Sequence, residues 1–499
     1  MKAHADVVTA RMGFNSYLLR KATLFPRSGG MARRSPELLR RLRLCTPTNP
    51  IYCQSAFPKL FPGMLTKGEW IMFTGESSHK QRRVHVLFGW RTLIAVGAVL
   101  VCRVQAGETS RSAPALLWGD LQPGPYVVGF KVLYRHDGTR KWLPSKGDSI
   151  RATPDKGRLI RVSMWYPAVP VKGAETMRYG DYFHYDGDND FRELNDQLEK
   201  GDRAGWLEDL KEVSSSGSEI FAKLCATPVA AIRNARSASG RFPVVFYAGG
   251  LGSAADANVE LAEYLASHGY IVATVPQLGP SAEEIDLLAT TAQEADVHVR
   301  DLEFALKVLR DLPHVSVADL AIAGHSAGGV AALQFAVRNP RVKVVVGLDG
   351  SYGMAPEPHR REEVMKALNQ LQLGDVKAFL LDMRRANGVQ GAELDHTVRH
   401  RMTRSDRYLV TFTKMFHGDF TEFGTIGLKL SVPLPPNNDG RTRETGFVGN
   451  QHAYRAALDF LDAKLKGRTE AFNLFLAEIA HTDGATMIHE PPELSTPTH

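Results

Sequence analysis

The sequence of 499 residues has little cysteine, and its cysteines are unevenly placed. Cys45, Cys53 and Cys102 lie in the first 106 residues, and Cys225 is the single cysteine beyond them. No disulfide can therefore form within residues 107–499. A chain of this length buries a large apolar core and does not depend on disulfides for stability. The cysteine content is compatible with export but does not argue for it.

The sequence also lacks the short motifs of metal and nucleotide cofactors. It has no HExxH and no CxxC, and the acidic run DGDND at 186–190 is too short for an EF-hand and lacks its closing glutamate. Gly250 and Gly252 follow an apolar run, as in a dinucleotide fingerprint. The next apolar run ends in VATVPQLG, without the acidic residue that would bind a ribose. We therefore predict no metal and no cofactor.

Positive charge is scarce over most of the chain, although the whole carries a net charge of +7. Residues 1–106 contain 17 Lys and Arg against 4 Asp and Glu, which leaves 44 against 50 for residues 107–499. The larger part is mildly acidic, so we expect no nucleic acid as a partner. The basic character belongs to the first segment alone.

Long apolar runs are scarce as well. The run 93–102 has about half the length that a membrane-spanning helix needs. Basic residues precede it and Val-Gln-Ala follows it at 104–106, which is the pattern of a cleaved secretory signal. We predict a signal peptide over 72–106 and a secreted or periplasmic protein; the alternative is a single N-terminal membrane anchor. Residues 1–71 are predicted to be a basic leader, either disordered or upstream of the true translation start.

Beyond residue 107, short β-branched runs alternate with helical patterns. Strands are predicted at 242–248, 270–276, 320–324 and 342–348, with a further pair at 376–381 and 407–413; helices are predicted at 256–268, 296–312 and 452–465. This alternation predicts an α/β protein with a mostly parallel central sheet flanked by helices. Residues 159–167, which end in proline, are predicted to be an antiparallel edge strand.

Residues 176–240 interrupt this alternation with acidic loops and an amphipathic stretch. We predict an inserted cap within one domain over 107–468, followed by a tail over 469–499. The apolar residues of the cap either pack on the core as a lid or touch a lipid surface. They are Trp206, Leu207, Leu210, Ile220, Phe221 and Leu224.

The most informative motif is Gly-His-Ser-Ala-Gly at 324–328. It follows the apolar run 320–324 and opens a helical pattern rich in small residues. A serine in such a strand-to-helix turn is held in a strained conformation at the positive end of a helix, with glycines preventing collisions. Ser326 is therefore the predicted nucleophile.

A nucleophilic serine needs a base and an acid, which follow it along the chain in the order acid, then histidine. Asp349 comes directly after the predicted strand 342–348, and His417 comes just after the last predicted strand. Asp382 is the alternative acid, but two arginines follow it and could pair with it. His417 is preferred by position over the other late histidines, which are His396, His400, His452, His481 and His489.

The oxyanion of an acyl-transfer reaction needs two N–H donors. One is expected from the backbone of Ala327, directly after the nucleophile. The other is expected from Leu251, within the glycine-rich loop GGLG at 249–252, where glycines let the backbone approach a substrate closely.

These motifs resemble the platelet-activating factor acetylhydrolase family of α/β-hydrolases, in its plasma and type II branch. The resemblance extends over about 118–465 and rests on GPYVVGF (124–130), VSMWYP (162–167), GGLG (249–252), GHSAGG (324–329), LDG (348–350) and HGDFTEF (417–423). It implies an α/β-hydrolase fold, an acid at Asp349, and oxyanion donors at Leu251 and Ala327. Two departures concern the acyl pocket: Gly249 stands where the family usually has histidine, and GSYG at 350–353 replaces bulkier apolar residues.

We predict a serine hydrolase that cleaves carboxylic esters through an acyl-enzyme. The resemblance implies short or oxidised acyl esters, including those of phospholipids, with no cofactor and no calcium. One alternative is a general carboxylesterase, a cutinase-like polyester hydrolase or a dienelactone-type hydrolase. An alternative of another class is a non-catalytic binding protein on a hydrolase fold. No feature of the sequence indicates the oligomeric state.

Overall fold

The computed structural model describes residues 116–141, 156–184, 186–187, 190–278, 291–353, 368–386, 397–434 and 440–493. The predicted leader and signal peptide lie outside these residues. Within them, no helix is both long enough and apolar enough to span a bilayer.

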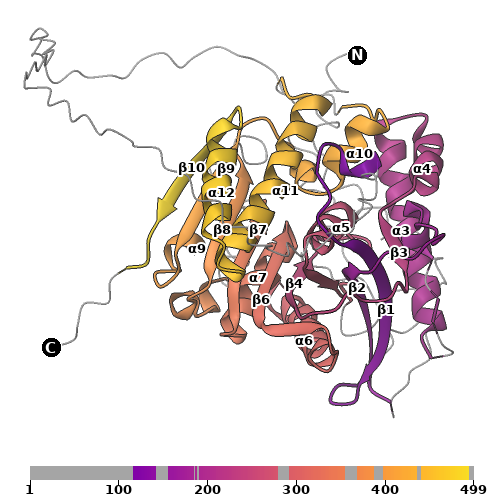
Figure 1. The fold of residues 1–499 in the computed structure, drawn as a ribbon, viewed down its shortest axis with the longest axis horizontal. Helices are drawn as coiled ribbons and strands as arrows, with labels where there is room; N and C mark the ends of the chain where they lie inside the picture. The colour runs from indigo at the N-terminus through magenta and orange to yellow at the C-terminus, as the bar shows by residue number, and fades with distance from the viewer. Residues whose placement is uncertain are drawn as a thin grey trace, which may run out of the picture. The chain divides into compact units, whose positions relative to one another are not determined.

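A ten-stranded sheet organises the described part of the chain, in the order β10-β9-β8-β7-β6-β4-β5-β2-β1-β3 (Figure 1). Its strands are β1 (Val127–Asp137), β2 (Arg158–Ala168), β3 (Ala231–Arg233), β4 (Phe242–Ala248), β5 (Ile271–Thr274), β6 (Val315–His325), β7 (Val342–Leu348), β8 (Phe379–Arg385), β9 (Arg407–Phe412) and β10 (Ala485–Glu490). The six strands from β5 to β9 in this order are parallel to one another. The predicted mostly parallel sheet is confirmed, and the chain has the α/β-hydrolase fold.

Helices cover both faces of this sheet. The α-helices are α3 (Arg192–Val213), α4 (Gly217–Ala226), α5 (Val259–Ser267), α6 (Thr291–Arg310), α7 (Ala327–Arg338), α9 (Thr397–His400), α10 (Phe423–Lys429), α11 (Arg443–Leu465) and α12 (Thr469–His481). Short 3₁₀ helices are η1 (Leu116–Trp118), η2 (Tyr179–Phe183), η3 (Ser351–Gly353), η4 (Leu373–Asp375) and η6 (His417–Phe420).

Strand β7 shows why the central strands are rich in apolar residues. Val344 and Val346 pack into the core beneath α5 and α11, whereas Val345 packs into the opposite core beneath α6 and α7. Successive side chains of a strand point to opposite faces, so a strand covered on both faces needs apolar side chains on both; the exposed Lys343 lies near the start of β7. On α6, the residues spaced to face the sheet are all buried: Leu302, Ala305, Leu306 and Leu309.

Strand β2 was predicted at an edge of the sheet, and that position is wrong. β2 lies between β1 and β5 and is antiparallel to both. Pro167 lies inside β2 but beyond the three residues that pair with β5, where a missing N–H disturbs the ladder least. The proline therefore marks the end of one pairing and not the edge of the sheet.

The segment after residue 468 is not a tail, which corrects the predicted domain boundary. It forms α12 and then β10, which pairs antiparallel with β9 and extends the sheet. Ala471, Phe475 and Ile479 recur every four residues and are buried on one face of α12. The described residues all belong to one compact unit that includes this segment.

The predicted cap insertion forms η2, α3, α4 and the short strand β3, which pairs parallel with β1. Leu210, Ile220 and Leu224 are buried, and Trp206 and Phe221 pack against the same core. Figure 1 shows α3 and α4 side by side at one flank of the sheet. The apolar side of the cap thus faces the protein, which favours the lid over the lipid-contact interpretation.

We predict that Phe475→Ala destabilises the whole domain. The Phe475 ring is fully buried and lies 5.2 Å from that of Phe460, centroid to centroid, so its removal leaves a cavity. We expect a loss of roughly 3–5 kcal/mol in the free energy of unfolding, measured by denaturant titration. Leu474→Ala is the matched control, because Leu474 is 59% exposed. Equal effects of the two changes would contradict the assignment of α12 to the core.

Candidate active site

Ser326 lies in the sharp turn between β6 and α7. Its backbone has φ 52° and ψ −124°, a strained conformation for a residue with a side chain. A Cβ atom on Gly324 would lie 2.4 Å from the Gly328 carbonyl oxygen, and one on Gly328 would lie 2.0 Å from the Ala248 carbonyl oxygen. Only glycine fits at these two positions, so the motif residues are what allow the turn to form.

The loop after β4 lies directly against Ser326. A Cβ atom on Gly250 would lie 3.1 Å from the Ser326 Cβ. Leu251 is in the following turn, which the Ser253 N–H closes on the Gly250 carbonyl at 3.1 Å. Ala327 is the first residue of α7. The structure thus places both predicted oxyanion residues in segments that adjoin the serine.

Asp349 and His417 form a short hydrogen bond. Asp349 follows β7, and His417 is the first residue of η6, after β9. The distance from His417 Nδ1 to Asp349 Oδ2 is 2.6 Å. Burial raises the pKa of Asp349, but the hydrogen bond from His417 and the charges of His417 and Arg385 outweigh it, so the net shift is downward. An ionised carboxylate therefore faces the imidazole.

Backbone hydrogen bonds tie the serine turn to the segment that carries Asp349. The Ser326 N–H donates to the Leu348 carbonyl at 3.2 Å, and the Ser351 N–H donates to the Ser326 carbonyl at 2.8 Å. The Ser351 hydroxyl lies 3.5 Å from the Ser326 hydroxyl. The nucleophile and the acid are thus held by one backbone framework.

His325 is a site residue that the sequence interpretation did not single out. Its ring lies 4.5 Å from that of His417, centroid to centroid, and its Nε2 lies 3.1 Å from the His417 carbonyl oxygen. Burial, reinforced by the charge of His417, lowers the pKa of His325 to about 3. The neutral ring therefore donates from Nε2 and holds the backbone of His417 next to the serine turn. The sequence signal that could have identified His325 is its position directly before Ser326 in the Gly-His-Ser-Ala-Gly motif.

Asp382, the alternative acid, is engaged elsewhere. It is fully buried, accepts a hydrogen bond from the Tyr352 hydroxyl at 2.9 Å, and pairs with Arg384 Nε at 2.7 Å. The structure does not bring it to His417 through any described contact. Of the two arginines that follow it, Arg384 pairs with Asp382, and Arg385 pairs with Asp349.

The remaining late histidines contact other groups. His452 pairs with Glu478, His481 contacts the Ala477 carbonyl, and His489 pairs with Asp406. His400 lies near Glu490. His396 lies outside the described residues.

The cap contacts segments on two sides of Ser326. In the loop after β4, the Ala255 N–H donates to Asp202 of α3 at 2.9 Å. In the segment after His417, the Trp206 ring of α3 lies 6.3 Å from the Phe423 ring. The Tyr179 hydroxyl of η2 donates to Glu422 at 3.0 Å.

Buried carboxyl groups behind the site were not predicted from the sequence. Glu260 accepts hydrogen bonds from Thr425 and Gln451, and Glu263 accepts them from Trp118 and Tyr182. Burial raises the pKa of Glu422 to about 7. Through their hydrogen bonds, these buried carboxyl groups connect α5 with α10, and both with η2 of the cap.

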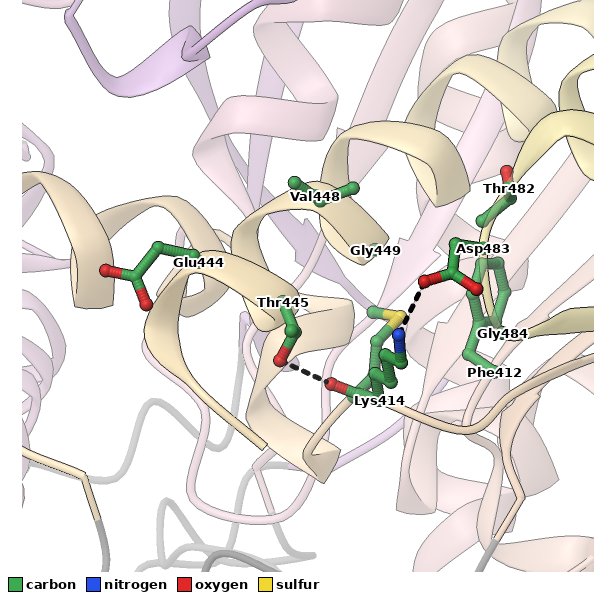
Figure 2. A pocket seen from close by; sticks show the side chains of 10 residues that line it. Phe412, Lys414, Glu444, Thr445, Val448, Gly449, Thr482, Asp483 and Gly484 are labelled. Carbon is green, nitrogen blue, oxygen red and sulfur yellow. Dashed lines mark hydrogen bonds and ion pairs between the residues drawn. The ribbon is translucent and has the colours of Figure 1, made fainter. Parts of the chain in front are cut away.

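A separate cavity of about 220 Å³ lies near the start of β10 (Figure 2). Phe412, Met415 and Val448 contribute apolar surface, and Lys414 pairs with Asp483 at 2.5 Å. None of the predicted site residues lines this cavity. Among the described residues, no group of three or more His, Cys, Asp or Glu side chains is arranged to hold a metal ion.

Comparisons with known proteins give a match to one family model and matches to solved structures. Residues 212–370 match the chlorophyllase family model. No curated protein sequence matches this chain significantly. Many solved structures match, among them a ferulic acid esterase from Streptomyces cinnamoneus, with 20% identity and a TM-score of 0.45 over 72% of this chain and 93% of that one.

We predict that Glu422→Gln reduces the pH dependence of stability. The Glu422 carboxyl has a raised pKa in the folded state, so folding binds a proton between pH 4.5 and about 7, and stability falls as pH rises through that window. The amide of glutamine has no charge to desolvate and can still accept from Tyr179. We expect the fall in unfolding free energy from pH 5 to pH 8 to shrink by about 1–3 kcal/mol.

The measurement is denaturant unfolding at several pH values. Glu175→Gln is the control, because Glu175 is exposed in a loop. An unchanged pH dependence in Glu422→Gln would show that this carboxyl does not bind a proton on folding.

Proposed function

We propose that this protein is a serine hydrolase that cleaves carboxylic esters through an acyl-enzyme. The observation that carries the proposal is the hydrogen bond of 2.6 Å between His417 and Asp349, formed beside the strained turn of Ser326. A base oriented by a buried carboxylate, next to a serine in such a turn, is the arrangement that acyl transfer requires.

In the proposed reaction His417 removes the hydroxyl proton of Ser326 as its oxygen attacks the ester carbonyl. Asp349 orients the imidazole and stabilises its charged form. The backbone N–H groups of Leu251 and Ala327 hold the oxyanion. The leaving alkoxide takes the proton from His417 and departs as the alcohol. Water, deprotonated by the same histidine, then attacks the acyl-enzyme. The bond from the acyl carbon to the Ser326 oxygen breaks, that oxygen takes the proton from His417, and the carboxylic acid leaves.

The match to the chlorophyllase family model supports this proposal over part of the site. The matched residues 212–370 include Leu251, Ser326 and Asp349, and end before His417. The assignment of the base therefore rests on its contact with Asp349.

For the substrate, we propose esters with short or oxidised acyl groups. The sequence resemblance to the platelet-activating factor acetylhydrolase family supports this class. The protein is proposed to act outside the cytoplasm, on the basis of the predicted signal peptide at 72–106.

We predict that Ser326→Ala, Asp349→Asn and His417→Ala each lower kcat/KM on a simple aryl ester by roughly 10³-fold or more. Each change removes a group that acts on the same proton transfer. Thermal unfolding of each variant shows whether it is folded when assayed.

Asp382→Asn serves as the matched control for the acid. We expect its kcat to stay within about tenfold of the wild-type value, while its stability falls because the buried Arg384 loses its counter-charge. An active Asp349→Asn enzyme together with an inactive, folded Asp382→Asn enzyme would reverse the assignment of the acid.

We predict that a fluorophosphonate probe labels the folded protein at Ser326 and nowhere in Ser326→Ala. The probe reacts only with an activated serine, so an intact protein that ignores it would instead be a binding protein.

Among esters of increasing chain length, we expect kcat/KM to be highest for short acyl groups. A long-chain preference, or equal rates at all lengths, would favour a general carboxylesterase; an sn-2 acetyl phospholipid tests the phospholipid class directly.

A further inference from the structure

The two arginines at the end of β8 serve different carboxylates. Arg384 Nε lies 2.7 Å from Asp382, whereas Arg385 Nε lies 2.9 Å from Asp349 Oδ2. Neighbouring side chains of a strand point to opposite faces, so Asp382 and Arg384 share one face and Arg385 takes the other. Arg385 is therefore the residue of this pair that reaches the site.

Arg385 engages both oxygens of the carboxylate that orients His417. Its side chain lies on Oδ2, the same oxygen that accepts from His417 Nδ1 at 2.6 Å. Its backbone N–H lies 3.3 Å from Oδ1. The Asp349 side chain is 1% exposed and that of Arg385 12%, so water screens this contact weakly.

Other charged and titratable groups surround the Asp349–His417 pair. Neutral His325 comes from the end of β6, and the Arg384–Asp382 pair comes from β8. On η6 itself, Asp419 accepts from the Phe416 N–H at 2.7 Å, and Arg441 and Arg443 act on Asp419. Of these groups, Arg385 is the one whose permanently charged side chain contacts the Asp349 carboxylate directly.

We propose that Arg385 is a positioning residue that orients Asp349 and opposes protonation of His417. The proposal rests on the function proposed above, in which His417 is the base. Removing the positive charge of Arg385 would leave the Asp349 carboxylate without its compensating cation and so favour the imidazolium over the neutral imidazole. The net lowering of the Asp349 pKa, to which Arg385 contributes, agrees with this arrangement.

The test compares Arg385→Met, which removes the charge, with Arg385→Lys, which keeps it. We expect the acid limb of the kcat/KM profile to move up by roughly one pH unit in Arg385→Met, and to stay near the wild-type position in Arg385→Lys. Arg300→Met is the matched control, because Arg300 pairs with Asp296 on the exposed side of α6 and its loss changes the net charge equally. If Arg385 had a purely structural role, Arg385→Met would lower kcat/KM at all pH values and leave the position of the acid limb unchanged.

A second readout does not depend on turnover. NMR titration of histidine-labelled protein, with the His417 signal assigned by His417→Gln, reports protonation of the same ring. We expect the midpoint to rise by the same amount in Arg385→Met. Should Arg385→Met fail to fold, Arg385→Gln replaces it, since glutamine keeps a donor for Asp349 without the charge.

The two readouts separate the two proposals. A raised midpoint in a protein that cleaves no ester would support the role of Arg385 and overturn the proposed hydrolase function. An unchanged midpoint and an unmoved acid limb in a folded, active charge-removing variant would overturn the role of Arg385 alone.

Discussion

The strained backbone of Ser326 is the constraint on which the rest of the site depends. A serine keeps a positive φ only when its surroundings leave no relaxed alternative. Here the surroundings are the ends of three neighbouring parallel strands. The Ala248 carbonyl of β4 lies against Gly328, Gly324 near the end of β6 lies against the start of α7, and the Leu348 carbonyl of β7 accepts the Ser326 N–H. The parallel sheet therefore does more than support the turn, because its strand ends form the walls that hold it.

The same sheet edge explains how much of the site could be predicted from sequence. Strands β6, β7 and β9 are apolar runs bounded by polar residues, so the residue after each run had to emerge at one edge. Ser326 was located by its motif, and Asp349 and His417 by their places after these runs; the structure brings Asp349 and His417 into contact. The alternation of strand and helix likewise predicted the order and type of the central elements.

What could not be predicted depended on contacts between distant segments. β1 and β5 enclose β2, and no local pattern in β2 distinguishes an enclosed strand from an edge strand. The period of α12 was present in the sequence, but its place in the domain depends on pairing between β10 and β9, some 75 residues apart. Arg384 and Arg385 look alike in the sequence, and only the pleat of β8 sends them to different acids.

The cap is joined to the main domain by buried hydrogen bonds as well as by apolar packing. Tyr179 donates to Glu422 and Tyr182 donates to Glu263, and all four side chains are buried. Moving the cap away as one body would expose these carboxyl groups and break both hydrogen bonds. Contact with a lipid surface would have to offset the free energy lost in this way. These buried hydrogen bonds therefore oppose movement of the cap as one body. In the proposed reaction, the substrate would therefore meet the cap in the position that the structure shows.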